Sequence, residues 1–351
     1  MSYVYIGTQD SGTGSGFQIA EFDSVSGVLS HPKLIEAARD PSIFLFNADG
    51  TRLYTCNSRT PGGLTAYLVD RHTGALSLQN AVIAEGRGPS HLSLDRTGRF
   101  VLDANYGGGY VEVFAIREDG GIGSRTALVH HEGRSVDPER QTRPYAHAIK
   151  TDPTNRFALA CDLGTDQVVV YRFDERTGAL EKNDPESYPV EPGSGPRHLS
   201  WHQNGSWLYV VMELKNTVVL YAWDSGRGIL VEQQTVSTLP GGFSGATTAA
   251  EIAVHPGGRW VYASNRGADS IAVFAVDSTS GRLTATGHVS SQGRTPRYFA
   301  FDPTARWLIV PNIDTDNVAV FAIDGATGGL TPHGDPVPAV RPHGIAFLPA
   351  S

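Results

Sequence analysis

The sequence predicts an all-β chain, a seven-bladed β-propeller with four-stranded antiparallel blades that occupies residues 1–351 as a single domain. Two observations predict this fold. A segment of about fifty residues recurs along the chain, and a period of that length with about four strands is typical of a propeller blade. In addition, the two ends of the chain supply complementary parts of one more copy, so the closing blade is shared by the N- and C-termini.

Each copy contains the same short segments in the same order. Residues 251–265 (EIAVHPGGRWVYASN) show an apolar strand, a turn and a second strand, and residues 296–308 (PRYFAFDPTARWL) repeat this pattern. An alternating strand such as residues 111–116 comes next, and a turn of the type Asp-x-x-Thr-Gly-x-Leu closes the unit. The segments are short, rich in Val, Phe and Tyr, and bounded by turn residues, which predicts strands.

Six copies are complete and the seventh is split. The complete copies open near Pro41, Pro89, Pro144, Pro196, Ala249 and Pro296. For the seventh copy, residues 341–347 supply the opening strand, and residues 3–6, 17–23 and 26–29 supply the rest. Pairing of the termini would remove the open edges that an unclosed array of sheets exposes. A pair of β-sandwiches is an alternative all-β fold, but it gives no reason for the split copy.

Composition argues against several classes of protein. The net charge of −8, with 18% charged residues, argues against a nucleic-acid partner, which would usually carry a basic face. Cys56 and Cys161 are the only cysteines, and we expect both to be buried free thiols rather than zinc ligands. The run 12–16 (GTGSG) lacks the Lys-Ser/Thr ending of a phosphate loop, so we expect a hairpin connection there.

Targeting signals are not visible in the sequence. The first residues, MSYVYIG, lack the basic and apolar regions of a signal peptide, and no apolar run reaches membrane-spanning length. We therefore expect a cytoplasmic protein with no membrane partner. The sequence does not indicate an oligomeric state.

The start of the first strand carries an ionisable side chain in most copies, where packing alone would favour an apolar one. These positions are Phe44, His91, His147, Arg197 with His198, Glu251, Arg297 and His343. Because the first strands of a propeller line its central tunnel, we expect these side chains to project around one ring. Ligands of propellers bind in such concave sites.

A second set of positions follows the second strand of each copy. The residues there are Asn57, Asn105, Asp162, Met212, Asn265 and Asn312. The recurring Asn or Asp is expected to cap a turn through its own backbone. The residue that comes next is Glu213 in the fourth complete copy and Arg266 in the fifth, and these are the unusual charges in this set.

The unusual residues of the third to fifth complete copies therefore form a candidate site. A His or Glu can act as general acid or base, and two Arg side chains suit a carboxylate, a phosphate or an oxyanion. The alternative is a purely structural role, in which these side chains form a network of salt bridges along the tunnel. Both interpretations stay open for His91, Glu251, Arg297 and His343. No Gly-x-Ser-x-Gly nucleophile motif exists, and Asp314 and Asp316 fit a polar loop better than a calcium site.

Several stretches carry a resemblance that covers nearly the whole chain. Residues 104–109 (ANYGGG), 195–198 (GPRH), 213–217 (ELKNT) and 264–267 (SNRG) resemble the seven-bladed propeller lactonase family. That family includes propeller-type 6-phosphogluconolactonases and the fungal cyclase that lactonises 3-carboxy-cis,cis-muconate. One departure is Tyr145, where many members have a second His, which implies a difference in substrate choice if that His binds substrate in relatives.

The resemblance implies an active site at one end of the tunnel. Its catalytic residues would be His147, Arg197, Glu213 and Arg266. We expect further substrate contacts from His198, Glu251, His91, Arg297 and His343.

The predicted function is hydrolysis of a sugar lactone such as 6-phosphogluconolactone, without metal or cofactor. Glu213 or His147 would activate water, and Arg197 and Arg266 would hold the substrate's anionic group and the oxyanion. One alternative is a cycloisomerase of the 3-carboxy-cis,cis-muconate type, which makes the same demands on proton transfer. The other is a non-catalytic propeller that serves as an interaction scaffold, which predicts an apolar or flat surface in place of the ionisable cluster.

Overall fold

The computed structural model describes residues 1–8, 15–36, 38, 40–57, 62–85 and 88–349. Within these residues the regular structure consists of β-strands grouped into seven sheets and one 3-10 turn, η1 (Ile313–Thr315). The chain divides into two compact units: the first contains Met1–Leu53, Tyr67–Leu78 and Ser237–Ser351, and the second contains Tyr54–Ala66 and Gln79–Val236. Residues 12–14 of the predicted hairpin connection lie outside the described residues.

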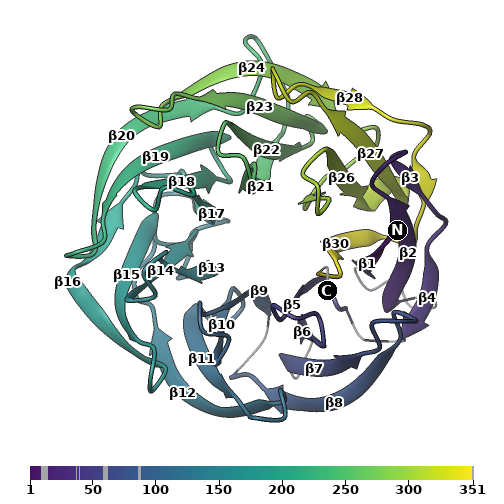
Figure 1. Cartoon of the computed structure of the whole chain (residues 1–351). Helices are drawn as coiled ribbons and strands as arrows, with labels where there is room; N and C mark the ends of the chain where they lie inside the picture. Colours follow the sequence, from purple (N-terminus) through teal and green to yellow (C-terminus); the bar gives the residue numbers. More distant parts are fainter. Residues whose placement is uncertain (9–14, 37, 39, 58–61, 86–87, 350–351) are drawn as a thin grey trace. The chain divides into compact units, whose positions relative to one another are not determined.

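The second unit contains three four-stranded antiparallel sheets, complete but for the terminal Ser237 of the last strand, and each is made of strands consecutive in the chain (Figure 1). Their strands are β9 (Pro89–Leu94), β10 (Phe100–Asn105), β11 (Tyr110–Ile116), β12 (Ile122–His130), β13 (Ala146–Thr151), β14 (Phe157–Asp162), β15 (Gln167–Asp174), β16 (Ala179–Pro189), β17 (Pro196–Trp201), β18 (Trp207–Met212), β19 (Thr217–Asp224) and β20 (Ile229–Ser237). The candidate residues of the third and fourth complete copies therefore lie in one unit.

The first unit contains the sheet that joins the two ends of the chain. Strand β30 (Pro342–Phe347) pairs antiparallel with β1 (Ser2–Thr8), as predicted for the split copy (Figure 1). The other strands of the unit are β2 (Phe17–Asp23), β3 (Val28–Leu29), β4 (Lys33–Glu36), β21 (Thr248–Val254), β22 (Trp260–Arg266), β23 (Ser270–Val276), β24 (Leu283–Ser290), β25 (Ala300–Phe301), β26 (Trp307–Asn312), β27 (Asn317–Ile323), β28 (Leu330–Pro332) and β29 (Val337–Pro338).

The seventh sheet has its residues divided between the two units. It runs β5 (Ile43–Phe46), β6 (Arg52–Asn57), β7 (Gly63–Val69) and β8 (Leu76–Ile83) in chain order. The predicted fold class, an all-β chain of seven four-stranded blades with a closing blade shared by the termini, is confirmed.

The repeated turns are scaffold, and Asp152 shows how they work. Its carboxylate is fully buried, and Oδ1 accepts hydrogen bonds from the backbone N–H groups of Arg156 and Phe157, both at 3.0 Å. The closing turn places Gly178 at φ +72°, where an added Cβ would lie 2.4 Å from the Phe100 ring. Only glycine fits this position without strain, which explains the Gly in the closing turn.

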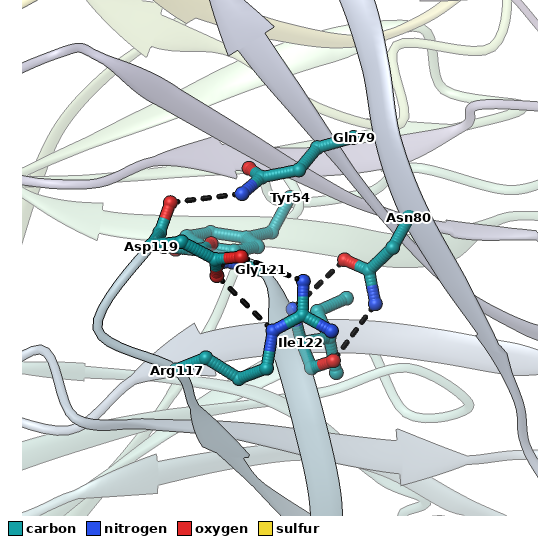
Figure 2. A network of polar contacts seen from close by, with 8 residues as sticks. Tyr54, Gln79, Asn80, Arg117, Asp119, Gly121 and Ile122 are labelled. Carbon is teal, nitrogen blue, oxygen red and sulfur yellow. Dashed lines mark hydrogen bonds and ion pairs between the residues drawn. The ribbon is translucent and has the colours of Figure 1, made fainter.

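Side chains of β6 and β8 in the second unit also form hydrogen bonds with the turn between β11 and β12 (Figure 2). The Asn80 amide of β8 donates to the Ile122 carbonyl at 2.8 Å and accepts from the Ile122 N–H at 3.0 Å. The Tyr54 hydroxyl of β6 donates to the Gly120 carbonyl at 2.8 Å. These contacts satisfy backbone groups of the turn between β11 and β12, so the polar cluster is structural.

Two simpler expectations concern cysteines and membrane spans. Cys56 and Cys161 are both free and buried, as predicted. Among the described residues, no helix is long and apolar enough to span a membrane.

Candidate active site

Two candidate residues of the second unit are the extra residues of β-bulges. His147 lies between the pairs Ala146–Asp162 and Ala148–Cys161, and Arg197 occupies the same place in the next sheet. A bulge inserts one residue that has no partner in the ladder and redirects its side chain, and bulges are common beside active sites. In the first unit, His343 sits at the corresponding irregularity of β30. The same backbone irregularity thus places His147, Arg197 and His343 at equivalent positions of their sheets.

The strand register shows that His91 and His147, which the sequence comparison placed at equivalent positions, are not structurally equivalent. In β9 the irregular position is Ser90, whereas His91 pairs regularly with Ala104. His198 likewise pairs regularly, with Val211, one residue after the bulge at Arg197. His91 is therefore the structural equivalent of His198 and not of His147.

Glu213 is a buried carboxylate that binds two guanidinium groups. It follows β18, and its backbone N–H donates to the Gly195 carbonyl at 2.8 Å. Its Oε2 lies 2.9 Å from Arg197 Nε, and its Oε1 lies 2.5 Å from Arg140 Nη2. The Arg197 side chain is 0% exposed, whereas that of Arg140 is 39% exposed. A buried charge requires such partners, because desolvation alone would make it very costly.

Arg140 was not identified from the sequence, and it comes from the connection between β12 and β13. Burial opposes its charge, but the hydrogen bond and charge of Glu213, aided by Tyr106, raise the pKa of Arg140. This connection spans residues 131–145, whereas the one between β16 and β17 spans residues 190–195. Long connections inside compact domains are often functional, and this length was the available signal.

Aromatic contacts connect His147 to the same cluster. Its ring centroid lies 5.5 Å from that of Tyr106 and 5.1 Å from that of His198, both edge-on. His198 in turn lies 5.3 Å from His91, and Tyr106 stacks on Tyr145 at 4.6 Å. The structure therefore brings the predicted His147, Arg197, His198, Glu213 and His91 into one cluster within the second unit.

Asp162 anchors the segment that leads into His147. Its Oδ1 accepts from the backbone N–H of Tyr145 at 2.9 Å and from that of Gly164 at 2.9 Å, so the predicted turn cap is confirmed. Its Oδ2 lies 2.6 Å from His131 Nδ1, and His131 Nε2 lies 2.6 Å from the Tyr171 hydroxyl. The tautomer with the proton on Nδ1 satisfies this chain, because Nδ1 then donates to Asp162 and Nε2 accepts from Tyr171. Burial raises the pKa of Tyr171, so this hydroxyl stays protonated.

The remaining candidates belong to the first unit. Arg266 Nη2 donates to the Ala249 carbonyl at 3.2 Å, and Glu251 Oε1 accepts from the Ile252 N–H at 2.9 Å. His343 Nδ1 lies 2.9 Å from the Ser42 carbonyl oxygen. Arg297 lies between β24 and β25, outside any strand. That these residues serve the same site as Glu213 stays a prediction.

The chemistry of the cluster is that of acid–base catalysis and anion binding. It offers imidazoles, a carboxylate and guanidiniums, and within the described residues no group of three or more His, Cys, Asp or Glu side chains is arranged to hold a metal ion. Such groups suit proton transfer at a polar bond and stabilisation of negative charge.

The class that the fold and this cluster define is a seven-bladed β-propeller with ionisable residues at the start of its first strands. The family described as "Lactonase, 7-bladed beta-propeller" matches residues 3–347, and the chain belongs to this family.

Relatives agree with this assignment. The chain is 36% identical over 298 residues to a Bacillus subtilis protein named 6-phosphogluconolactonase, covering 85% of this chain and 84% of that one. A putative 6-phosphogluconolactonase from Bacteroides fragilis has a TM-score of 0.91 at 32% identity, covering 99% and 97% of the two chains. A Pseudomonas aeruginosa periplasmic gluconolactonase has a TM-score of 0.92 at 30% identity, covering 99% of each chain.

Proposed function

We propose that this chain is a lactonase that hydrolyses a sugar lactone, with 6-phosphogluconolactone as the first substrate to test. The observation that carries the proposal is one cluster of ionisable side chains. Glu213 binds Arg197 and Arg140, and Tyr106, which neighbours Arg140, also contacts His147. The named activities of the relatives supply the substrate class.

The reaction requires one proton transfer to the enzyme and one back. Water attacks the lactone carbonyl carbon, the tetrahedral oxyanion collapses, and the ring C–O bond breaks with protonation of the ring oxygen, giving a hydroxy acid. We assign the proton transfers to His147, because each oxygen of Glu213 already binds a guanidinium. Arg197, being fully buried against Glu213, acts as a positioning residue. Arg266 remains the predicted donor to the oxyanion.

The test is ring opening of sugar lactones by the purified protein, followed as acid release against an enzyme-free control. His147→Asn should lower kcat/KM by about 10²- to 10⁴-fold, the usual contribution of general acid–base catalysis. Circular dichroism shows whether the variant is folded. A wild-type rate no greater than spontaneous hydrolysis for every sugar lactone would contradict the proposal.

The alternatives lead to different outcomes of the same experiment. A cycloisomerase would convert 3-carboxy-cis,cis-muconate and leave sugar lactones intact. An interaction scaffold predicts an apolar or flat surface, whereas the cluster around Glu213 is charged and suits a small polar molecule. Binding of a small-molecule lactone or sugar acid is therefore part of the proposal.

Location and domain organisation complete the proposal. Cell fractionation would test the expected cytoplasmic location. This test matters because one structurally similar protein is described as periplasmic. The expectation of a single domain over residues 1–351 agrees with a family match that spans residues 3–347. It predicts one cooperative unfolding transition in calorimetry.

A further inference from the structure

We infer that Arg140 is a specificity-determining residue, which binds the anionic group (a phosphate or a carboxylate) of the lactone. This inference rests on the proposed lactonase function and assigns a role to a residue that neither the repeat comparison nor the family resemblance identified.

Exposure distinguishes the two guanidiniums that bind Glu213. Arg197 is fully buried, so it has no surface with which to meet a ligand from solvent. Arg140 binds the same carboxylate with its side chain 39% exposed. Of these two, Arg140 is the one that an incoming anion can reach.

The Arg140 guanidinium has N–H donors that Glu213 does not use. A guanidinium carries five N–H groups in a planar fork, and Glu213 Oε1 takes one of them through Nη2. Tyr106 is a second neighbour of this side chain and contributes to its raised pKa. The remaining N–H groups suit paired contacts with the oxygens of a phosphate or carboxylate. Because Glu213 already fixes the fork, a ligand loses less affinity to the ordering of this side chain.

The backbone that carries Arg140 is also held in place. Asp137 Oδ1 accepts from the backbone N–H groups of Glu139 and Arg140, both at 2.9 Å. The Gln141 amide donates to the Leu163 carbonyl at 2.9 Å, which ties the connection to the end of β14. A functional side chain on a supported backbone keeps its geometry, as a specificity contact requires.

The experiment compares 6-phosphogluconolactone with unphosphorylated gluconolactone. Arg140→Gln should lower the ratio of kcat/KM for the phosphorylated over the neutral lactone by about 10- to 100-fold, the value of a charge-assisted hydrogen bond. Arg140→Lys, which keeps the charge but loses the fork, should give an intermediate ratio. Arg134→Gln removes an exposed charge from the same connection and should leave the ratio unchanged.

The possible results separate this inference from the proposed function. If Arg140→Gln lowers both rates equally, Arg140 serves only to hold Glu213 and the inference is overturned. If the wild-type protein hydrolyses neither lactone, the proposed function fails, and calorimetric binding of 6-phosphogluconate and gluconate then decides the role of Arg140. The inference is supported if Arg140→Gln no longer binds 6-phosphogluconate more tightly than gluconate while Arg134→Gln still does. It is overturned if both variants still bind 6-phosphogluconate more tightly.

Discussion

Two buried acidic sites in the second unit differ in the number of cations available to them. Glu213 is a single carboxylate with two guanidinium partners, Arg197 and Arg140. Asp103 and Glu112 face each other across β10 and β11, and Glu112 lies 3.3 Å from the single guanidinium of Arg125.

The consequence is a difference in protonation. Burial, followed by the charge of Glu112, raises the pKa of Asp103 well above its ordinary value. Burial also raises the pKa of Glu112, although Arg125 opposes this effect. The pair therefore retains a proton at pH values at which an exposed carboxyl group has lost it. The number of cationic partners, two for Glu213 and one for the acid pair, accounts for this difference.

The largest expected effect comes from removing the charge at the cation-rich site. Glu213→Gln leaves the buried guanidinium of Arg197 without its carboxylate, and breaking such a pair costs about 3–5 kcal/mol of folding stability. Displacement of Arg140 should also lower kcat about 100-fold, as a misplacement of 1 Å can do. Urea denaturation and steady-state kinetics below the unfolding transition measure the two effects.

Asp103→Asn is the matched control, because it replaces an acid that already carries a proton. If both variants lost activity to the same extent, the distinction between the two sites would be wrong.

The sequence predicted the fold because the scaffold repeats. The turn aspartates and glycines recur in successive copies, and their contacts recur with them, as Asp152 and Gly178 show. Glu213 was found for the opposite reason, since it departs from a repeated pattern, whereas His147 and Arg197 belong to a position that is ionisable in most copies. Arg140 could not be found in this way, because its connection has no counterpart of similar length with which to compare it.

The acid pair also escaped prediction, for a reason that concerns burial. The alternation in residues 111–116 is typical of a strand with one solvated face, which would place Glu112 in water. Both faces of β11 are covered in its central part, and Glu112 is 0% exposed. Period-two alternation reports the polarity of the side chains, whereas the covering of the outer face depends on packing between sheets.

Asp162 is a third buried carboxylate, and changing the chain of hydrogen bonds that it begins should have an effect of intermediate size on stability. Asp162 has backbone N–H groups and His131 as hydrogen-bond partners, and Tyr171 completes the chain of hydrogen bonds. Tyr171→Phe removes the hydroxyl and leaves His131 Nε2 unsatisfied, which should cost about 1–3 kcal/mol. Urea denaturation measures this loss, and a smaller change in kcat than for Glu213→Gln is expected. An unchanged unfolding free energy would show that the chain does not stabilise the fold.

Asp103→Asn should have the smallest effect on the unfolding free energy at acid pH. It should also change the pH dependence of that free energy most clearly. A carboxyl group whose pKa is raised by folding stabilises the protein below its unfolded pKa, and this contribution is lost as the pH rises through the folded pKa. The unfolding free energy of the wild type should therefore fall more steeply than that of Asp103→Asn as the pH rises above the ordinary Asp pKa of about 3.9. Glu112, Glu85, Arg125 and Tyr110 are the charged and titratable groups that face this site in both proteins. Parallel curves would mean that Asp103 is ionised when folded, and the contrast with Glu213 would then rest on exposure and not on the number of cations.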